Sequence, residues 1–124
     1  MQKVALITGS TKGIGLAIAQ QLLAQKCRVI LNYANDDHEA VRVGELLASN
    51  FGQESFAILK ADLSTYSGLC SFVDEVGALT QSLDYLILNA AITDKTPFNK
   101  MEYGNWQKVM NTNLSIPFFL IQKM

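Results

Sequence analysis

Residues 8 to 15 read Thr-Gly-Ser-Thr-Lys-Gly-Ile-Gly and directly follow the apolar run from Val4 to Ile7. A glycine-rich segment of this kind constrains the fold when it joins a buried strand to a helix, because glycine permits a tight turn and places no Cβ in the way of a phosphate group. The first turn of the helix adds unpaired N–H groups and about half a positive charge. The segment therefore predicts a pyrophosphate-binding turn at the start of the chain.

The residues after this turn show helical periodicity. Ile14, Ile18 and Leu22 recur at every fourth position beside Ala17 and Ala24, which predicts one apolar stripe along a helix. Residues 27–31, Cys-Arg-Val-Ile-Leu, then predict a second buried strand. A strand, a glycine turn, a helix and a strand within about thirty residues indicate a βαβ unit.

The same alternation continues without a linker or a repeat. We expect a helix over 37–51, a strand over 56–59, a helix capped by Ser64 or Thr65, a strand over 85–88 and a last helix from about residue 104 to the end. The expected apolar side of the last helix is formed by Trp106, Val109, Met110, Leu114 and Phe118. Right-handed crossovers between such strands predict an α/β fold, a Rossmann-type doubly wound parallel sheet in three α/β/α layers with strand order 3-2-1-4.

Composition narrows the classes of partner. The chain has a net charge of −1, 17% charged residues and no basic stripe, so we expect neither nucleic acid nor an anionic membrane as a partner. No export signal precedes the first strand and no apolar run approaches the length of a membrane span, which favours the cytoplasm. Cys27 and Cys70 stand alone, and His38 is expected in a solvated loop, so no metal site is predicted.

Four polar or small-residue segments fall where predicted strands end. In a doubly wound sheet, ligands bind at the carboxyl ends of the strands, where the strand order reverses. The segments are the glycine turn, Asn32-Tyr33, Asp62-Leu63 and Asn89-Ala90-Ala91. We expect all four to meet at one crevice.

These segments, together with Asn113-Leu114, occur in the order and at the spacing of a known family, so that the whole chain resembles the short-chain dehydrogenase/reductase family. The stretch from Ile92 to Leu114 is similar to the branch of 3-oxoacyl-[acyl-carrier-protein] reductases, although sugar and alcohol dehydrogenases of the family look similar there. The resemblance implies an oxidoreductase that interconverts a carbonyl and an alcohol by hydride transfer with a nicotinamide cofactor. Its substrate would be a small-molecule or acyl-carrier-bound carbonyl compound.

The resemblance also implies roles for individual residues. The turn would admit the pyrophosphate, Asp62 would accept from the adenine amino group while Leu63 packs beside the ring, and Asn89, Ala90 and Ala91 would line the ribose side. Asn113 would be the asparagine of the catalytic helix. Two other readings stay open, in which Asp62 only caps the third helix and Asn113 is a polar surface residue. The turn comprises Gly9, Ser10, Thr11, Lys12, Gly13, Ile14 and Gly15.

Two departures from the family pattern lie at the end of the fourth strand and just after it. Leu88 and Ala91 stand where the family most often has Asn and Gly. The methyl group of Ala91 is small, so we expect a slightly tighter approach of the ligand rather than a lost site.

Pro117 supports a role for Asn113 by a separate argument. A proline has no N–H to donate to the carbonyl four residues back, so Pro117 leaves the Asn113 carbonyl free and should kink the last helix. A free carbonyl can hold a water, which is the part that this asparagine plays in the family's proton relay. Alternatively, Pro117 only bends the helix around the core.

The cofactor is predicted to be NADP rather than NAD. NAD-binding members of the family resemble one another in an acidic residue at the end of the second strand, where this chain has Asn32 and Tyr33. Lys12 occupies the basic position that NADP-preferring members use. Asp36 and Asp37 could instead accept a hydrogen bond from the ribose 2′-hydroxyl, since they lie about 20 residues after the last glycine, where such an acid is expected. Acidic residues also suit the start of a helix.

The catalytic residues that the resemblance implies are a Ser and a Tyr-x-x-x-Lys, and none of the four tyrosines has a lysine four residues later. We therefore expect residues 1–124 to be the N-terminal part of a single dinucleotide-binding domain, truncated after the fourth helix and inactive alone. The alternative is a non-catalytic NADP-binding or regulatory module. A homo-oligomer is also expected, because the fourth strand and Trp106, Phe118 and Phe119 of the last helix would be exposed.

Overall fold

The computed structural model describes all residues from 1 to 124. Its strands are β1 (Val4–Ile7), β2 (Arg28–Tyr33), β3 (Phe56–Lys60) and β4 (Tyr85–Ile87). Its α-helices are α1 (Gly13–Ala24), α2 (Asp37–Phe51), α3 (Tyr66–Leu79), α4 (Tyr103–Met110) and α5 (Ile116–Lys123). Short 3-10 turns cover Gln53–Ser55 and Phe98–Lys100, and a π-helical segment, Asn111–Ser115, joins α4 to α5.

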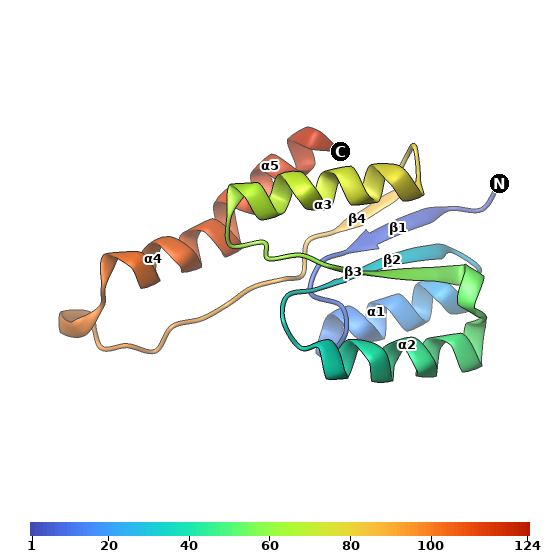
Figure 1. Ribbon diagram of the computed structural model, residues 1–124, viewed down its shortest axis with the longest axis horizontal. Helices are drawn as coiled ribbons and strands as arrows, with labels where there is room; N and C mark the ends of the chain where they lie inside the picture. The colour runs from blue at the N-terminus through green and yellow to red at the C-terminus, as the bar shows by residue number, and fades with distance from the viewer.

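The four strands form one parallel sheet in the order β3-β2-β1-β4, as predicted. Helices α1 and α2 cover one face, and α3 and α5 lie on the other, so the fold has three layers (Figure 1). The register places Ile7 beside Leu31 and Ile87, and Tyr33 beside Lys60. The carboxyl ends of all four strands consequently meet at one edge of the sheet.

Each face of the sheet has its own apolar core. One core packs Ala5, Ile7, Val29 and Leu31 against α1 and α2, and the other packs Leu6 and Ile30 against α3 and α5. Successive strand residues point to opposite faces, so strands that are apolar at every position fill both cores.

The buried stripe of α1 is offset from the predicted one. Gly15, Ala19 and Leu23 are its buried residues, whereas Ile14 is 74% exposed. The prediction was wrong by one position, because the small residues Gly15 and Ala19 let the helix approach the sheet closely while Ile18 and Leu22 pack at the margin of the core.

The C-terminal helical region differs most from expectation. The prediction was one helix whose apolar side includes Trp106, Leu114 and Phe118, but these three side chains are exposed. The buried residues are instead Thr112, Ile116 and Leu120, which lie on the opposite stripe. A π-helical segment also lies just before Pro117, and in it the N–H of Ile116 donates to the carbonyl of Asn111.

Candidate functional site

The glycine turn between β1 and α1 contains three glycines in three different situations. Gly9 has a φ of +59°, and a Cβ there would lie 2.9 Å from the Cα of Ala90. A Cβ on Gly15 would lie 2.5 Å from the carbonyl oxygen of Gly9. Gly13 has a φ of +57° and nothing within 4 Å of a built Cβ, so it faces open space. Gly9 and Gly15 therefore allow the chain to pack against itself, and Gly13 leaves room for a ligand.

Buried side chains hold this turn in place. The hydroxyl of Ser10 donates to the carbonyl of Ile7 (2.7 Å) and accepts from the N–H of Asn32 (3.0 Å). The Oδ1 of Asn32 accepts from the N–H of Gly9 (3.0 Å). The sequence predicts that Ser10, Thr11 and Asn32 contact a cofactor, whereas the structure buries all three. Ser10 and Asn32 accordingly support the turn from within the protein.

The first turn of α1 is open to solvent and has no side-chain cap. Lys12 occupies its N-cap position with extended backbone and makes no capping hydrogen bond, and no acidic residue lies in the first turn. By contrast, Asp36 caps α2 by accepting from the N–H of Glu39, and Thr65 caps α3 by accepting from the N–H of Gly68. Lys12, Gly13 and Ile14 are all exposed. The N-terminus of α1 thus offers its N–H groups and its positive end to an anion.

Thr8 links the turn to the segment after β4. Its Oγ1 accepts from the N–H groups of both Asn89 and Ala90, each at 3.0 Å. The Nδ2 of Asn89 donates in turn to the carbonyl of Gly9 (2.9 Å). Sequence reasoning did not single out Thr8 as a site residue, although a hydroxyl at the end of an apolar strand is a signal that could have found it. Ala91 lies exposed just beyond these contacts.

Asp62 follows β3 and forms a turn with Ser64. One carboxylate oxygen accepts from both the N–H (2.9 Å) and the hydroxyl (2.6 Å) of Ser64, which lowers the pKa of Asp62 below its ordinary value. The second oxygen accepts no hydrogen bond within the chain and remains available. The reading in which Asp62 caps α3 is wrong, because Thr65 is the cap. The side chain of Leu63 is buried in the core.

Asn113 lies on the π-helical segment and holds the loop that follows β4. Its Oδ1 accepts from the N–H of Ile92 (2.9 Å) and its Nδ2 donates to the carbonyl of the same residue (2.8 Å). Asn113 is exposed, but this pair of bonds gives it a definite structural partner. Nearby, the hydroxyl of Thr112 is buried without a hydrogen-bond partner.

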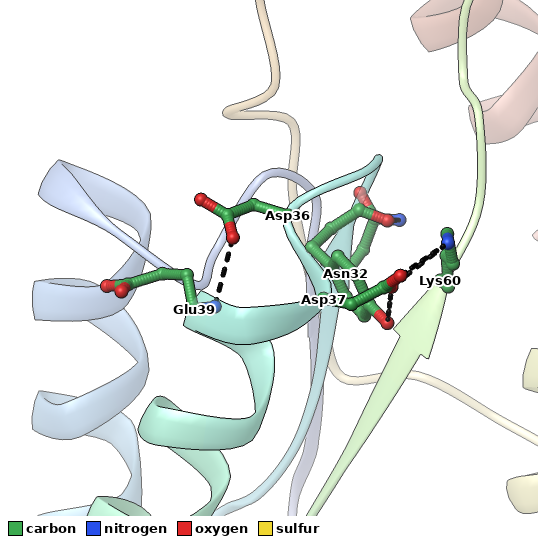
Figure 2. Close-up of polar contacts among 6 residues, drawn as sticks. Asn32, Asp36, Asp37, Glu39 and Lys60 are labelled. Carbon is green, nitrogen blue, oxygen red and sulfur yellow. Dashed lines mark hydrogen bonds and ion pairs between the residues drawn. The ribbon is translucent and has the colours of Figure 1, made fainter.

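Asp36 and Asp37 begin α2, which confirms the helix-start reading of these two acids. At the end of β2, the Tyr33 hydroxyl donates to the carboxylate of Asp37 (2.8 Å), and this contact raises the pKa of Tyr33. Figure 2 shows Asp36 turned toward the backbone N–H of Glu39 and Asp37 turned toward Lys60.

Other classes of site find little support. No group of three or more His, Cys, Asp or Glu side chains gathers as a metal ion would require. His38 is exposed as expected, but it lies in the first turn of α2 rather than in a loop. None of the helices is both long enough and apolar enough to cross a bilayer.

Comparison with known proteins places this architecture in a family. The family model described as short chain dehydrogenase matches residues 3–124. A 3-oxoacyl-[acyl-carrier-protein] reductase FabG from Staphylococcus epidermidis is 37% identical over all 124 residues, which cover 50% of that relative. An acetoacetyl-CoA reductase from Rhizobium meliloti is 37% identical over 116 residues, or 93% of this chain and 45% of the relative.

Solved structures agree with this placement. The RhlG/NADP active-site complex from Pseudomonas aeruginosa aligns with a TM-score of 0.83 and 31% identity, over 98% of this chain and 46% of that one. A metagenomic short-chain oxidoreductase in complex with NADP aligns with a TM-score of 0.86 and 28% identity, over 98% of this chain and 54% of that one. The chain spans about half the length of the curated relatives it matches. On these matches and on its 3-2-1-4 sheet, the chain belongs to the short-chain dehydrogenase family.

Proposed function

We propose that this chain forms the NADP(H)-binding part of an oxidoreductase that interconverts a carbonyl and an alcohol by hydride transfer. The observation that carries the proposal is the glycine turn with an open position at Gly13, directly before a helix N-terminus that lacks a side-chain cap. A pyrophosphate suits such a turn because its oxygens accept hydrogen bonds from the unpaired N–H groups and its negative charge complements the helix dipole. When bound, the nicotinamide supplies or accepts the hydride.

The residues present fit this cofactor. The N–H groups of the first turn of α1 would hold the pyrophosphate, and the unpaired oxygen of Asp62 would accept from the adenine amino group. Asn89, Ala90 and Ala91 would line the ribose side. Lys12 is exposed and forms no ion pair within the chain, so it can contact a 2′-phosphate. The NADP and NADPH complexes among the similar structures support the choice of NADP.

We further propose a 3-oxoacyl thioester as the substrate, because the most similar relatives include reductases of 3-oxoacyl-[acyl-carrier-protein] and of acetoacetyl-CoA. Asn113 would take part in the proton relay, in which its carbonyl would hold a water. The Ser and the Tyr-x-x-x-Lys would come from outside these 124 residues. We expect the active protein to be a cytoplasmic homo-oligomer.

Turnover and cofactor binding test the proposal together. The whole protein should oxidise NADPH in the presence of acetoacetyl-CoA, and the 124-residue chain alone should bind NADPH without oxidising it. Lys12→Glu should reverse the preference for NADPH over NADH, since a charge-assisted hydrogen bond of about 1.5–3 kcal/mol corresponds to roughly 10- to 150-fold in affinity. Failure of the whole protein to bind either nucleotide would refute the proposal.

A second candidate is a module that binds NADP without turning it over. Tight NADPH binding by the whole protein, with no turnover of any 3-oxoacyl thioester, would select this candidate.

A further inference from the structure

A cluster of three side chains joins the ends of β2 and β3 to the start of α2. Tyr33 and Lys60 are the last residues of their strands and lie beside each other in register, while Asp37 is the first residue of α2. Lys60 Nζ lies 2.9 Å from one oxygen of the Asp37 carboxylate and 3.1 Å from the other. The Tyr33 hydroxyl donates to the first oxygen. Both oxygens of Asp37 are therefore occupied (Figure 2).

The ion pair between Asp37 and Lys60 is charged but open to solvent. The hydrogen bond from Lys60, followed by that from Tyr33, lowers the pKa of Asp37, and the same contact with Asp37 raises the pKa of Lys60. The side chains of Lys60 and Asp37 are 52% and 65% exposed. Exposed ion pairs of this kind stabilise a protein very little. An incoming dianion can therefore replace the single carboxylate at Lys60 at small cost.

The other two carboxylates at this edge are also engaged. Asp36 accepts from the N–H of Glu39 (3.0 Å), and Glu39 receives two hydrogen bonds from Arg42, at 2.7 and 3.0 Å. The pKa of Glu39 is lowered first by Arg42 and, more weakly, by charges that include Lys12. Lys12 is thus within electrostatic reach of the start of α2. Asp37 accepts through both carboxylate oxygens and Glu39 pairs with Arg42, whereas Asp36 accepts through Oδ1 alone. Lys60 ends β3 and Lys12 follows β1, so both lysines lie at the carboxyl ends of the strands.

We propose that Lys60 is a specificity-determining residue for the adenosine 2′-phosphate, and that Asp37 is its internal counter-ion. A bound 2′-phosphate replaces the Asp37 carboxylate as the ion-pair partner of Lys60, and Asp37 keeps its hydrogen bond from the Tyr33 hydroxyl. A nucleotide without that phosphate leaves the ion pair closed and gains no contact with Lys60. This inference rests on the proposed NADP function and adds a second lysine, from β3, to the one predicted in the glycine turn.

Titration of the protein with two small probes tests the proposal. Adenosine 2′,5′-bisphosphate carries the 2′-phosphate, and adenosine 5′-monophosphate lacks it. Lys60→Met should weaken the Kd for the bisphosphate by about 10-fold or more and leave that for the monophosphate unchanged, because a charge-assisted hydrogen bond is lost only with the former. Lys60→Arg should restore the preference. Lys3→Met, which removes the same charge before β1 at the opposite edge of the sheet, is the matched control and should change neither Kd.

A double-mutant cycle tests whether Asp37 acts on the bisphosphate through Lys60. Asp37→Asn should tighten binding of the bisphosphate several-fold in the native background and should have no effect in the Lys60→Met background. An equal gain in both backgrounds would overturn the counter-ion role, since Asp37 would then act by simple repulsion. Circular dichroism and the melting temperature verify that each variant is folded.

The same titrations distinguish failure of the NADP assignment from failure of the role of Lys60. If the unmodified protein binds the bisphosphate no more tightly than the monophosphate, the NADP assignment fails and this inference fails with it. If the unmodified protein prefers the bisphosphate and Lys60→Met retains the whole preference, only the role of Lys60 is overturned.

Discussion

Replacing Gly15 with alanine is the sharpest test of how the glycine turn is built. The new Cβ would lie 2.5 Å from the Gly9 carbonyl oxygen, 2.7 Å from Nδ2 of Asn89 and 2.9 Å from Cα of Ser10. Two of these three atoms belong to the backbone, so a movement of the Asn89 side chain alone cannot relieve the contacts. The turn must instead shift away from α1 by about 1 Å to reach ordinary van der Waals distance.

The expected loss of stability follows from three contributions. Overpacking costs about 1–3 kcal/mol, and loss of the hydrogen bond from Asn89 to Gly9 costs about 1 kcal/mol more. The higher helix propensity of alanine returns about 0.5–1 kcal/mol. The net loss of about 1–3.5 kcal/mol should lower the melting temperature by roughly 4–14 °C in a chain of this length, as followed by circular dichroism.

Gly77→Ala provides the matched control. Gly77 also lies within a helix, α3, but a Cβ there would meet nothing within 4 Å. The same substitution should therefore raise stability by about 0.5–1 kcal/mol through helix propensity alone. If Gly15→Ala and Gly77→Ala changed the melting temperature alike, the steric reasoning for Gly15 would be refuted.

Three further perturbations address the polar contacts of the crevice. Thr8→Val keeps the side-chain shape but removes the acceptor of two backbone N–H groups after β4, so urea unfolding should show a loss of about 1–3 kcal/mol, and an unchanged midpoint would contradict this. Asn113→Ala removes both hydrogen bonds to Ile92 and should accelerate amide hydrogen exchange in the loop that follows β4; unaltered exchange would show that the loop is held by other contacts. The pKa of Asp62 is lowered by Ser64, so its stabilising contribution is present at neutral pH and is lost as the pH falls below the ordinary carboxyl value of 3.8 and through the folded pKa. Asp62→Asn should lose stability less steeply than the native protein across that acidic range, and parallel curves would exclude the effect.

Much of the fold could be predicted because several local signals agree. The predicted bounds of α2, 37–51, are confirmed: the structure adds Asp36 as the cap of its first turn, and Gly52, with a φ of +90°, ends it. The strand order followed from four apolar runs and from right-handed crossovers, which leave few alternatives.

The face of the C-terminal helices could not be predicted in the same way. The sequence of α4 and α5 carries two apolar stripes, one through Leu114 and Phe118 and one through Ile116 and Leu120. A periodicity argument assumes a regular helix and cannot tell which stripe faces the sheet, whereas the π-helical segment changes the helical rotation between the two halves. Packing against α3 and the sheet selects the stripe with Ile116 and Leu120.

The polar residues of the turn posed a different difficulty. A Ser or an Asn at a strand end can face a ligand or hold the backbone, and both roles suit the same residue type. The structure shows that Ser10 and Asn32 hold the backbone, because a turn with two glycines at positive φ lacks the regular hydrogen bonds of a helix or strand and needs side-chain partners. A turn fixed in this way loses less conformational freedom when a ligand binds.

The uncapped start of α1 allows the anion site to be tested separately from the contact to a 2′-phosphate. Lys12 has the extended backbone of an N-cap residue, so Lys12→Ser should supply the missing cap and raise the stability of the protein by about 0.5–1 kcal/mol. The same hydroxyl would occupy an N–H group that a pyrophosphate needs. Affinity for NADH should therefore fall, although NADH has no 2′-phosphate and loses no contact with Lys12. A stabilised variant that binds NADH as tightly as the native protein would show that the N-terminus of α1 is not where the nucleotide binds.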